Sequence, residues 1–535
     1  PPPPPPPFFF FQADPATPDP LWSRGLGDVY KRQIQLQPLN LNYTPESHRE
    51  GLATYFREFL RAHMKTWIND ENNRKPDGSK YNLNTDGLKI YTTINYSMQE
   101  MAENAVLTHM PRLQKEFFEQ NETLDDSIAP FRELTSGAVD TLLRISMRRS
   151  ERWRKMKYDL KKDNEEIEES FFVPKEMTVF SWEGEIDTIM TPLDSMKYYK
   201  SFFRPGMMSM DPTNGYIKAW VGGMNYRHFQ YDMVKKGKRQ IGSTFKPFVY
   251  AAAIDQLKLS PCDTFPDSQF CIQKNKFGNV EQWCPKNSGD KYGRTRTLKN
   301  ALANSVNTVT ARLMDRIGPR TVVKLAKDLG IEQRILPVPS IALGTPDLSV
   351  YEMVAAYSTF ANKGVYTQPV FIERIEDKNG TTLYENKPVT RDVLSEEAAY
   401  VTVNLLEGVT KAGSGTRLRT TGADEFNRAY QNVVTGYPYE FTNPIAGKTG
   451  TTQNQSDGWF IGMVPNLVTG VWVGAEDRAI HFEDIAYGQG ATMALPIWAN
   501  YMRNIYLDTT LMISKEPFEK PQILNIELDL SLIHI

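Results

Sequence analysis

The sequence is poor in the residues from which disulfide scaffolds and metal sites are built. Its 535 residues contain three cysteines, Cys262, Cys271 and Cys284, without a C-x-x-C pair, and its six histidines are scattered. A disulfide scaffold, a zinc site or any other metal site is therefore not expected, nor is an organic cofactor. One disulfide fits an oxidising envelope, but the sequence does not choose which two cysteines form it.

Long apolar runs and an excess of one charge are also missing. No stretch approaches ~18 consecutive apolar residues, so no membrane span is expected in this chain. Lysine and arginine number 62 against 64 aspartate and glutamate, a net charge of −2. This balance gives no reason to expect nucleic acid or an anionic membrane surface as a partner. The length predicts about two to four domains and at least one large core.

Both ends of the chain differ in amino-acid composition from the rest. The segment 1–33 begins "PPPPPPPFFFF" and ends "GLGDVYKRQ", and we expect it to be non-native and adapter-derived. A Pro-rich interaction arm is the alternative. Residues 504–535 are read as a C-terminal tail whose last residues, "SLIHI", are also non-native.

Hydrophobic periodicity divides the remaining chain into regions. Residues 34–96 contain a helical stretch, "HREGLATYFREFLRAHMKTW", and a strand-like "GLKIYTTI", whereas 97–200 is helical and then forms short strands near "FFVPKEMTVFSWEGEIDTIM". Basic and acidic residues alternate in "RRSERWRKMKYDLKKDNEEIEES", which indicates a solvated helix with i,i+4 pairs rather than a binding arm.

From residue 201 to 503 the pattern is strands, then helices, then strands again. Helices are expected around 243–257, 297–316, 319–329, 349–363 and 394–408. This order predicts an α+β fold in which helices flank an antiparallel sheet whose strands come from both ends of the region.

The first chemical motif is "GSTFKPF", in which Ser243 precedes a helix and Lys246 follows one turn later. Ser243 lies where free N–H groups point outward, and Lys246 returns to the same face. A partly buried lysine with a lowered pKa can take the serine proton. The alternative is a capping serine beside a surface lysine, since S-x-x-K occurs again at Ser288–Lys291.

The second motif is "ANSVNTVTARL", with Ser305 and Asn307 before an amphipathic helix. The hydroxyl can relay a proton and the amide can hold a substrate amide, although a plain N-cap explains the same residues.

The third motif is "AGKTGTT", in which Lys448 and Thr449 precede Gly450 and Thr451. We interpret it as an extended strand whose glycine lets a substrate backbone approach closely. A phosphate-binding loop is the alternative, but it needs a glycine where Thr442 stands.

In the order S-x-x-K, S-x-N, K-T-G, the three motifs resemble those of penicillin-binding proteins and β-lactamases. The segments "RQIGSTFKPFVYAAAI", "LKNALANSVNTV" and "IAGKTGTTQNQSDGWFIG" resemble the transpeptidase half of class A penicillin-binding proteins. The resemblance implies the penicillin-binding/β-lactamase-like transpeptidase fold at 201–503, an interdomain region at 97–200, and a linker at 34–96. That linker would follow a glycosyltransferase domain that is missing from this chain.

By this resemblance, Ser243 is the nucleophile that attacks the penultimate D-Ala carbonyl of a stem peptide, and Lys246 is its general base. Ser305 and Lys448 pass the proton to the leaving amine, and Asn307 holds the donor backbone. The implied product is a peptidoglycan cross-link made by a serine-type D-Ala-D-Ala transpeptidase.

The resemblance also implies substrate contacts at the third motif. Thr449, Gly450 and Thr451 would bind the donor, and the backbone N–H groups of Ser243 and Thr451 would form the oxyanion hole. The partners implied are stem peptides that supply the donor and the amine acceptor, and β-lactam antibiotics. The parent protein would be membrane-anchored in a bacterial envelope, on the periplasmic side of the inner membrane.

Three other functions use the same motifs. A β-lactamase is disfavoured because no E-x-x-L-N-like segment lies between the second and third motifs and because Val306 stands where S-D-N has an aspartate. A D,D-carboxypeptidase, in which water resolves the acyl-enzyme, stays open. So does a non-catalytic scaffold that only binds peptidoglycan or β-lactams.

Overall fold

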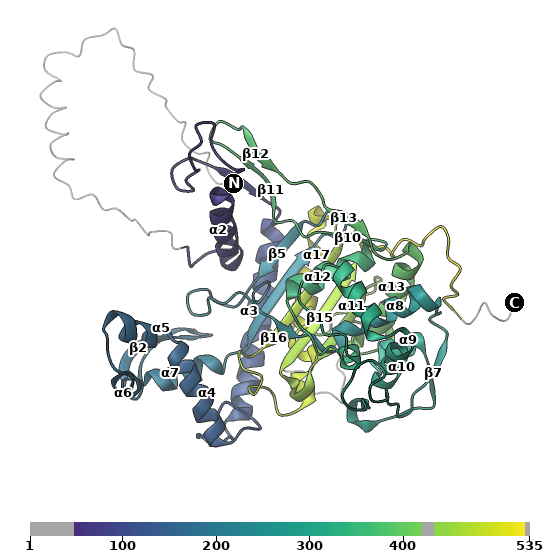
Figure 1. Cartoon of the computed structure of the whole chain (residues 1–535), viewed down its shortest axis with the longest axis horizontal. Coiled ribbons are helices and arrows are strands. Elements are labelled where there is room, and N and C mark those ends of the chain that lie inside the picture. The colour runs from purple at the N-terminus through teal and green to yellow at the C-terminus, as the bar shows by residue number, and fades with distance from the viewer. Residues whose placement is uncertain (1–47, 420–432, 530–535) are drawn as a thin grey trace, which may run out of the picture. The chain divides into compact units, whose positions relative to one another are not determined.

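A five-stranded antiparallel sheet, assembled from two distant parts of the chain, forms the centre of the fold (Figure 1). Its order is β14-β15-β16-β4-β5, so the pair β16–β4 joins the late strands to the early ones. The strands are β4 (Arg204–Met210), β5 (Ile217–Val221), β14 (Ala446–Thr451), β15 (Asp457–Val464) and β16 (Leu467–Gly474). The expected α+β sheet is confirmed.

The computed structural model describes residues 48–419 and 433–529. The expectations for 1–33 and for the final residues 530–535 therefore lie outside the described residues. No helix in the described ranges is both long enough and apolar enough to cross a membrane.

The sheet is buried on both faces because helices cover each side. All residues of β15 and β16 are buried. Successive side chains alternate between two hydrophobic clusters, as a pleated strand requires: Met208 and Trp472 belong to one, Met207 and Val471 to the other. Covering both faces explains why these strands are continuously apolar rather than alternating.

Helices in one layer carry the first two motifs, and the long helices α3 (Tyr96–Asn121) and α17 (Leu495–Leu507) cover the other face of the sheet (Figure 1). The first layer contains α8 (Lys246–Leu257), α9 (Leu298–Ala303), α10 (Asn307–Ile317), α11 (Pro319–Asp328), α12 (Val350–Ala361) and α13 (Glu396–Ala412). The prediction of a single helix at 297–316 is wrong, because residues 304–306 interrupt the helix between α9 and α10.

The predicted helix and strand of the linker region both form. They are α2 (Thr54–Asn69) and β1 (Lys89–Thr92), and β1 pairs with β11 (Ile372–Glu376), which pairs with β12 (Thr382–Glu385). Beside this small sheet, β10 (Val365–Thr367) pairs with β13 (Thr390–Asp392).

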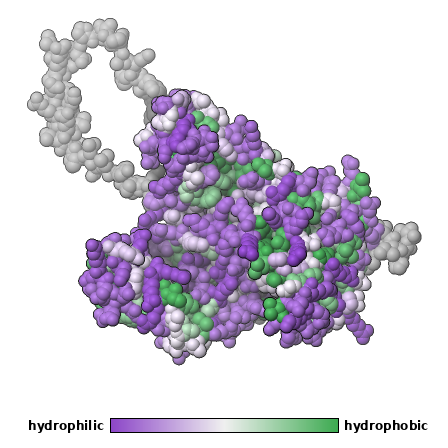
Figure 2. Space-filling view, in the orientation of Figure 1, coloured by the Kyte–Doolittle hydropathy of each residue, from purple (hydrophilic) through white to green (hydrophobic). Residues whose placement is uncertain are grey.

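Residues 136–200 form a mostly polar region. It contains α4 (Ser136–Arg149), α5 (Glu151–Arg154), α6 (Asn164–Glu169), β2 (Lys175–Ser181), β3 (Gly184–Met190) and α7 (Pro192–Lys200). The i,i+4 pairs Lys155–Glu151 and Lys162–Glu166 confirm the solvated interpretation of the charged run, and the surface there is largely hydrophilic (Figure 2). The single helix expected there is wrong, because the run is divided among the end of α4, α5, a π-helical turn and α6. Helix α7 was not expected among the strands; the Thr191 cap and Pro192 at its first turn explain its start.

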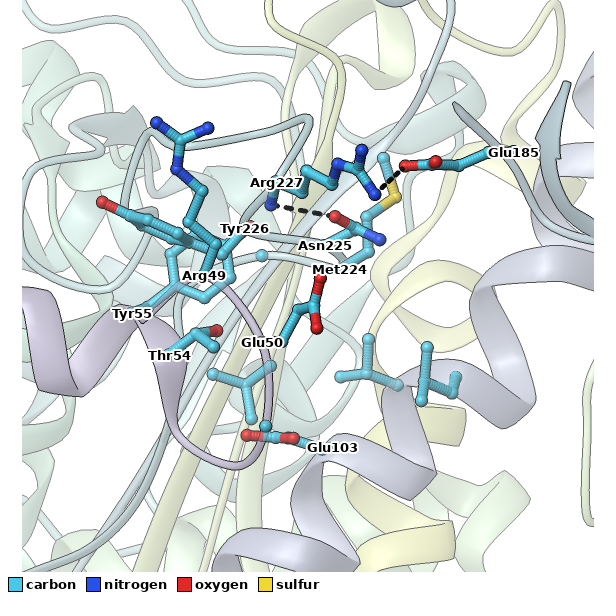
Figure 3. A pocket seen from close by; sticks show the side chains of 15 residues that line it. Arg49, Glu50, Thr54, Tyr55, Glu103, Glu185, Met224, Asn225, Tyr226 and Arg227 are labelled. Carbon is cyan, nitrogen blue, oxygen red and sulfur yellow. Dashed lines mark hydrogen bonds and ion pairs between the residues drawn. The ribbon is translucent and has the colours of Figure 1, made fainter. Parts of the chain in front are cut away.

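The β2–β3 hairpin contacts the segment that follows β5 through the carboxylate of Glu185 and through the ring of Phe180, which packs edge-to-face on Phe229. Glu185 of β3 pairs with Arg227 at 3.0 Å and with His228 at 2.7 Å, both in the segment that follows β5. Figure 3 shows the pocket of about 300 Å³ beside this contact, to which α2 contributes Tyr55 and α3 contributes Glu103. None of the residues predicted for catalysis lines that pocket.

Candidate active site

The first motif lies where a short strand turns into a buried helix. Strand β6 (Arg239–Gln240), paired with β9 (Asp347–Leu348), leads into a 3-10 turn (Gly242–Phe245) and then into α8. Gly242 has φ +52°, and a Cβ there would lie 2.9 Å from the carbonyl oxygen of Thr451. Only glycine therefore allows the turn that carries Ser243 to lie against strand β14.

Lys246 is the centre of the polar contacts between the motifs. Its Nζ donates to Ser305 O at 2.5 Å, to Ser305 Oγ at 3.1 Å and to Asn307 Oδ1 at 2.5 Å. Burial, and then the positive charge of Lys448, hold the pKa of Lys246 well below its usual value. A buried amine of this kind gives up its proton readily and can then accept one.

Ser305 lies between two buried amines. Lys448 Nζ donates to Ser305 Oγ at 3.1 Å, the same distance as Lys246, and to Thr449 O at 2.9 Å. Burial lowers the pKa of Lys448 to about 7. Ser305 itself has φ +55°, an uncommon conformation for a serine, and it separates α9 from α10. A proton can therefore pass between the hydroxyl and either lysine.

Asn307 is held by a loop that the motif analysis left without a role. Its backbone N–H donates to Asn287 Oδ1 at 3.0 Å, the N–H of Thr308 donates to the same oxygen at 3.1 Å, and Asn307 Nδ2 donates to Lys286 O at 2.7 Å. The plain N-cap interpretation is wrong, because Val306 occupies the cap position and the capping oxygen comes from Asn287.

The capping residue Asn287 is itself fixed by a fully buried carboxylate. Asp267 accepts from Asn287 Nδ2 at 2.7 Å, from Thr308 Oγ1 at 2.9 Å and from Arg296 Nε at 2.5 Å. The sequence carried no signal for this network, since Asp267, Asn287 and Arg296 are far apart in the chain and belong to no motif. Their meeting depends on how the loop folds back onto α10.

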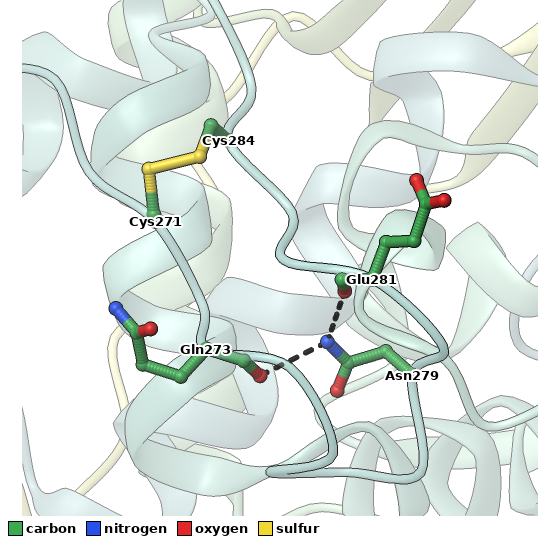
Figure 4. The surroundings of a disulfide bond; sticks show 5 residues. All are labelled: Cys271, Gln273, Asn279, Glu281 and Cys284. Carbon is green, nitrogen blue, oxygen red and sulfur yellow. Dashed lines mark hydrogen bonds between the residues drawn. A yellow bond between two sulfur atoms is a disulfide. The ribbon is translucent and has the colours of Figure 1, made fainter.

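A disulfide between Cys271 and Cys284 bridges the part of this loop that directly precedes Asn287 (Figure 4). Asn279 fixes its tip by donating to Gln273 O at 3.0 Å and to Glu281 O at 2.6 Å. Short strands β7 (Thr264–Pro266) and β8 (Thr295–Thr297) pair at its base. The contacts of Asn287 and Lys286 with Asn307 place this loop beside the second motif.

The third motif forms β14, the edge strand of the sheet. Thr452 N donates to Asp457 O at 3.3 Å, and by antiparallel alternation the N–H of Thr451 points away from β15 toward the free edge. Ser243 is the second residue of its 3-10 turn, where its N–H has no acceptor within the turn. The phosphate-loop alternative is wrong, because a strand pair rather than a helix surrounds the motif.

The side chains of Thr449 and Thr451 share one face of β14. Ser414 Oγ lies 2.5 Å from Thr449 Oγ1, and the N–H of Gly490 donates to Thr451 Oγ1 at 3.1 Å. Gly450 faces the protein's own backbone, since a Cβ there would lie 2.9 Å from Ile241 O. Close packing against the Ser243 turn therefore requires a glycine here, and the approach of a substrate backbone to Gly450 stays a prediction.

Asp457 connects the first and third motifs through hydrogen bonds to a residue just before the one and a residue just after the other. It is fully buried and accepts from Arg239 Nε at 2.7 Å, from Trp472 Nε1 at 2.9 Å and from Thr452 Oγ1 at 3.3 Å. Arg239 lies in β6, just before the serine turn, and Thr452 follows β14. The sequence analysis missed this carboxylate.

The structure thus brings the three motifs together, with one exception in the hydrogen bonding. In the described ranges, no side-chain hydrogen bond joins Ser243 to Lys246, because the three N–H donors of the amine are directed at Ser305 and Asn307. Nor do these ranges hold any group of three or more His, Cys, Asp or Glu side chains that could bind a metal ion.

A family model described as the penicillin-binding protein transpeptidase domain matches residues 206–479, just over half of the 535-residue chain. The chain belongs to this family. A second model, the penicillin-binding protein middle domain, matches residues 126–203. The family predicted from the motifs is confirmed, while the limits of the expected domains stay a prediction.

Curated relatives carry the same family name. The chain is 31% identical over 449 residues to penicillin-binding protein 1A of Aquifex aeolicus, a match that covers 81% of this chain and 55% of the relative. It is 34% identical over 300 residues to penicillin-binding protein 2D of Bacillus subtilis, covering 56% of this chain and 40% of that protein. The chain thus spans about half the length of these relatives, or less.

Solved structures agree on the penicillin-binding fold. Penicillin-binding protein 1A of Haemophilus influenzae aligns with a TM-score of 0.62 at 20% identity, covering 94% of this chain and 77% of that one. The PonA1 protein of Mycobacterium tuberculosis, solved in complex with penicillin V, aligns with a TM-score of 0.55 at 20% identity, covering 89% and 97%.

Proposed function

We propose that this penicillin-binding protein is a peptidoglycan D,D-transpeptidase that works through an acyl-enzyme at Ser243. The observation that carries the proposal is the pair of buried amines, Lys246 and Lys448, each 3.1 Å from the hydroxyl of Ser305 and adjoining the serine turn. Two lysines with lowered pKa values around one hydroxyl form a proton path, which acyl transfer needs and simple binding does not.

Acylation begins when Ser243 Oγ attacks the penultimate D-Ala carbonyl of a stem peptide. Neutral Lys246 takes the serine proton, and one of its three contacts to Ser305 and Asn307 gives way, since a neutral amine has two N–H donors and one lone pair. The C–N bond to the terminal D-Ala then breaks. Its amine leaves with a proton delivered through Ser305, which Lys448 and Lys246 flank.

The developing negative charge falls on the carbonyl oxygen. The N–H groups of Ser243 and Thr451 are the donors proposed for it, because one lies at the start of a 3-10 turn and the other points to the free edge of β14. Each such donor contributes about 3 kcal/mol to stabilising the transition state.

The terminal carboxylate of the donor is assigned to the third motif. Thr449 and Thr451 present hydroxyls on one face of β14, and the charge of Lys448 complements the carboxylate. An amine from a neighbouring stem peptide then attacks the ester and forms the cross-link. β-Lactams would acylate the same serine. No step calls for a metal or an organic cofactor.

The cellular setting follows from the family and is part of the same proposal. The relatives are penicillin-binding proteins. We assign this chain to the extracytoplasmic side of a bacterial inner membrane, as part of a membrane-anchored protein that binds stem peptides and β-lactams.

A donor that ends in D-Ala-D-Ala, offered with and without glycine as the amine acceptor, tests the proposed reaction. We expect release of D-Ala, and we expect the share of peptide transferred to glycine to increase with the glycine concentration. Mass spectrometry of the products measures both. Exclusive hydrolysis at every glycine concentration would identify a carboxypeptidase. Folded protein that acts on neither donor nor β-lactam would be a binding scaffold.

Asn287→Ala is expected to slow acylation by benzylpenicillin about tenfold to hundredfold. The substitution removes the oxygen that fixes the N–H of Asn307, and small misplacements at a reacting site cost up to about 10² in rate. The second-order rate constant is measured with a fluorescent penicillin, and the melting temperature reports the loss of a cap, worth about 1 kcal/mol.

Asn279→Ala is the matched control for Asn287→Ala. Asn279 fixes the tip of the same loop through two backbone carbonyls, and its side chain bonds none of the motif residues. We expect Asn279→Ala to change stability with little effect on acylation. Equal slowing by both variants would show that loop integrity, and not the contact with Asn307, governs the rate.

A further inference from the structure

A second pocket lies apart from the three motifs, between helix α2 and the helical layer. Its volume is about 850 Å³, within the range of small-molecule sites, and no predicted catalytic residue lines it. Its walls come from helices α2, α11 and α12, from strands β10 and β13, and from the segments that follow α11 and precede β11. Four aromatic side chains form much of its apolar lining: Phe59, Tyr351, Tyr366 and Phe371.

Among the cations that line this pocket, Lys235 lies against two aromatic rings and forms no ion pair with a described residue. Lys235 is half-buried, and its Nζ lies 3.7 Å from the ring centroid of Tyr351 and 5.7 Å from that of Phe59. Within the ranges 48–419 and 433–529, no carboxylate lies within ion-pair distance of this amine, although the more distant charges of Glu332, Glu352 and Asp232 act on it. Burial lowers the pKa of Lys235. The rings offset part of the cost of burying the charge, and an anion would offset more.

The other charges of the lining leave the pocket net positive. Lys327, Arg334 and Arg391 add cations, against the carboxylates Glu332 and Glu352. Glu352 is already neutralised outside the pocket, because Lys238 Nζ lies 2.6 Å from its Oε2 and Ser349 donates to the same oxygen. An anionic ligand would therefore meet more unbalanced positive than negative charge.

We propose that this pocket binds a small organic anion, a carboxylate attached to a flat apolar body. Lys235 would pair with the carboxylate, and the rings of Tyr351, Tyr366 and Phe371 would contact the apolar part. Aromatic walls with a few placed polar groups are typical of small-molecule sites. The proposal does not depend on the reaction at Ser243, since the two sites share no residue.

The probe for this test is 4-(trifluoromethyl)benzoate. Its fluorine NMR line width is measured as the whole chain is titrated into the solution. We expect saturable broadening with wild type and weak broadening with the uncharged 4-(trifluoromethyl)benzamide. Lys235→Met should weaken benzoate binding at least tenfold while keeping the apolar stem of the side chain. Raising the salt should also weaken binding, because the pocket is open to solvent.

Lys236→Met is the matched control, because it removes the same charge from the neighbouring exposed position, which does not line the pocket. Binding should survive this change, and melting curves establish that both variants fold. Benzoate broadening that persists in Lys235→Met, that the benzamide reproduces, or that both variants lose equally would overturn the proposal. So would the absence of saturable broadening in wild type.

Discussion

Ser243→Ala is expected to abolish the covalent adduct that benzylpenicillin forms with this protein. In wild type, intact-mass spectrometry should show one benzylpenicilloyl group per chain, and the adduct should persist because the proposed site contains no assigned base for hydrolysis. The side chain of Ser243 has no hydrogen bond to another described residue. Its loss should therefore change the free energy of unfolding by no more than about 0.5 kcal/mol.

The control for this experiment is Ser288→Ala, in the second S-x-x-K copy of the chain. Ser288 is exposed in a short 3-10 turn (Ser288–Asp290), and its side chain has no hydrogen bond to Lys246 or Lys448 in the described part of the chain. It should acylate like wild type. An adduct that survives Ser243→Ala would show that another serine is the nucleophile. Rapid loss of the wild-type adduct would indicate a β-lactamase.

Lys246→Met is expected to lower the acylation rate constant by about 10²–10⁴-fold, the range for removing a general base. Methionine fills a similar volume but can neither accept the serine proton nor donate to Ser305 and Asn307. Stopped-flow measurement with a fluorescent penicillin gives the rate constant. The noncovalent affinity, taken from the concentration dependence of the rate, should change much less.

Lys258→Met controls for the loss of one positive charge from the same helix. Lys258 follows the last turn of α8 and is exposed, so its replacement should leave acylation unchanged. If Lys246→Met kept its rate within tenfold of wild type, Lys246 would not be the base. Lys448, whose pKa burial lowers to about 7, would then be the next residue to replace.

The parts of the fold that the sequence predicted are those with a strong local pattern. Helices α8, α11, α12 and α13 begin and end within a few residues of their expected limits, because each has a buried face and a clear start. The break at Ser305 was not predicted. The positive φ of Ser305 costs conformational energy, which its contacts with the two lysines offset. Hydrophobic periodicity contains no information about such a residue.

The candidate site shows the same division. Residue type and spacing identified Ser243, Lys246, Ser305, Asn307, Lys448 and the strand 449–451, because each motif is short and contiguous. Asp267, Asn287 and Asp457 were missed, since each acts on a motif distant in the chain. Their side chains become informative only when the loop and the sheet place them against the motif residues.

The sequence by itself determined the family and the order of the three motifs, since these depend on the identities of neighbouring residues. Only the tertiary structure decided that both lysines are buried around one hydroxyl, that Asn287 caps α10, and that Cys271 pairs with Cys284. Burial sets the pKa of each amine, and burial is a property of everything packed around a residue.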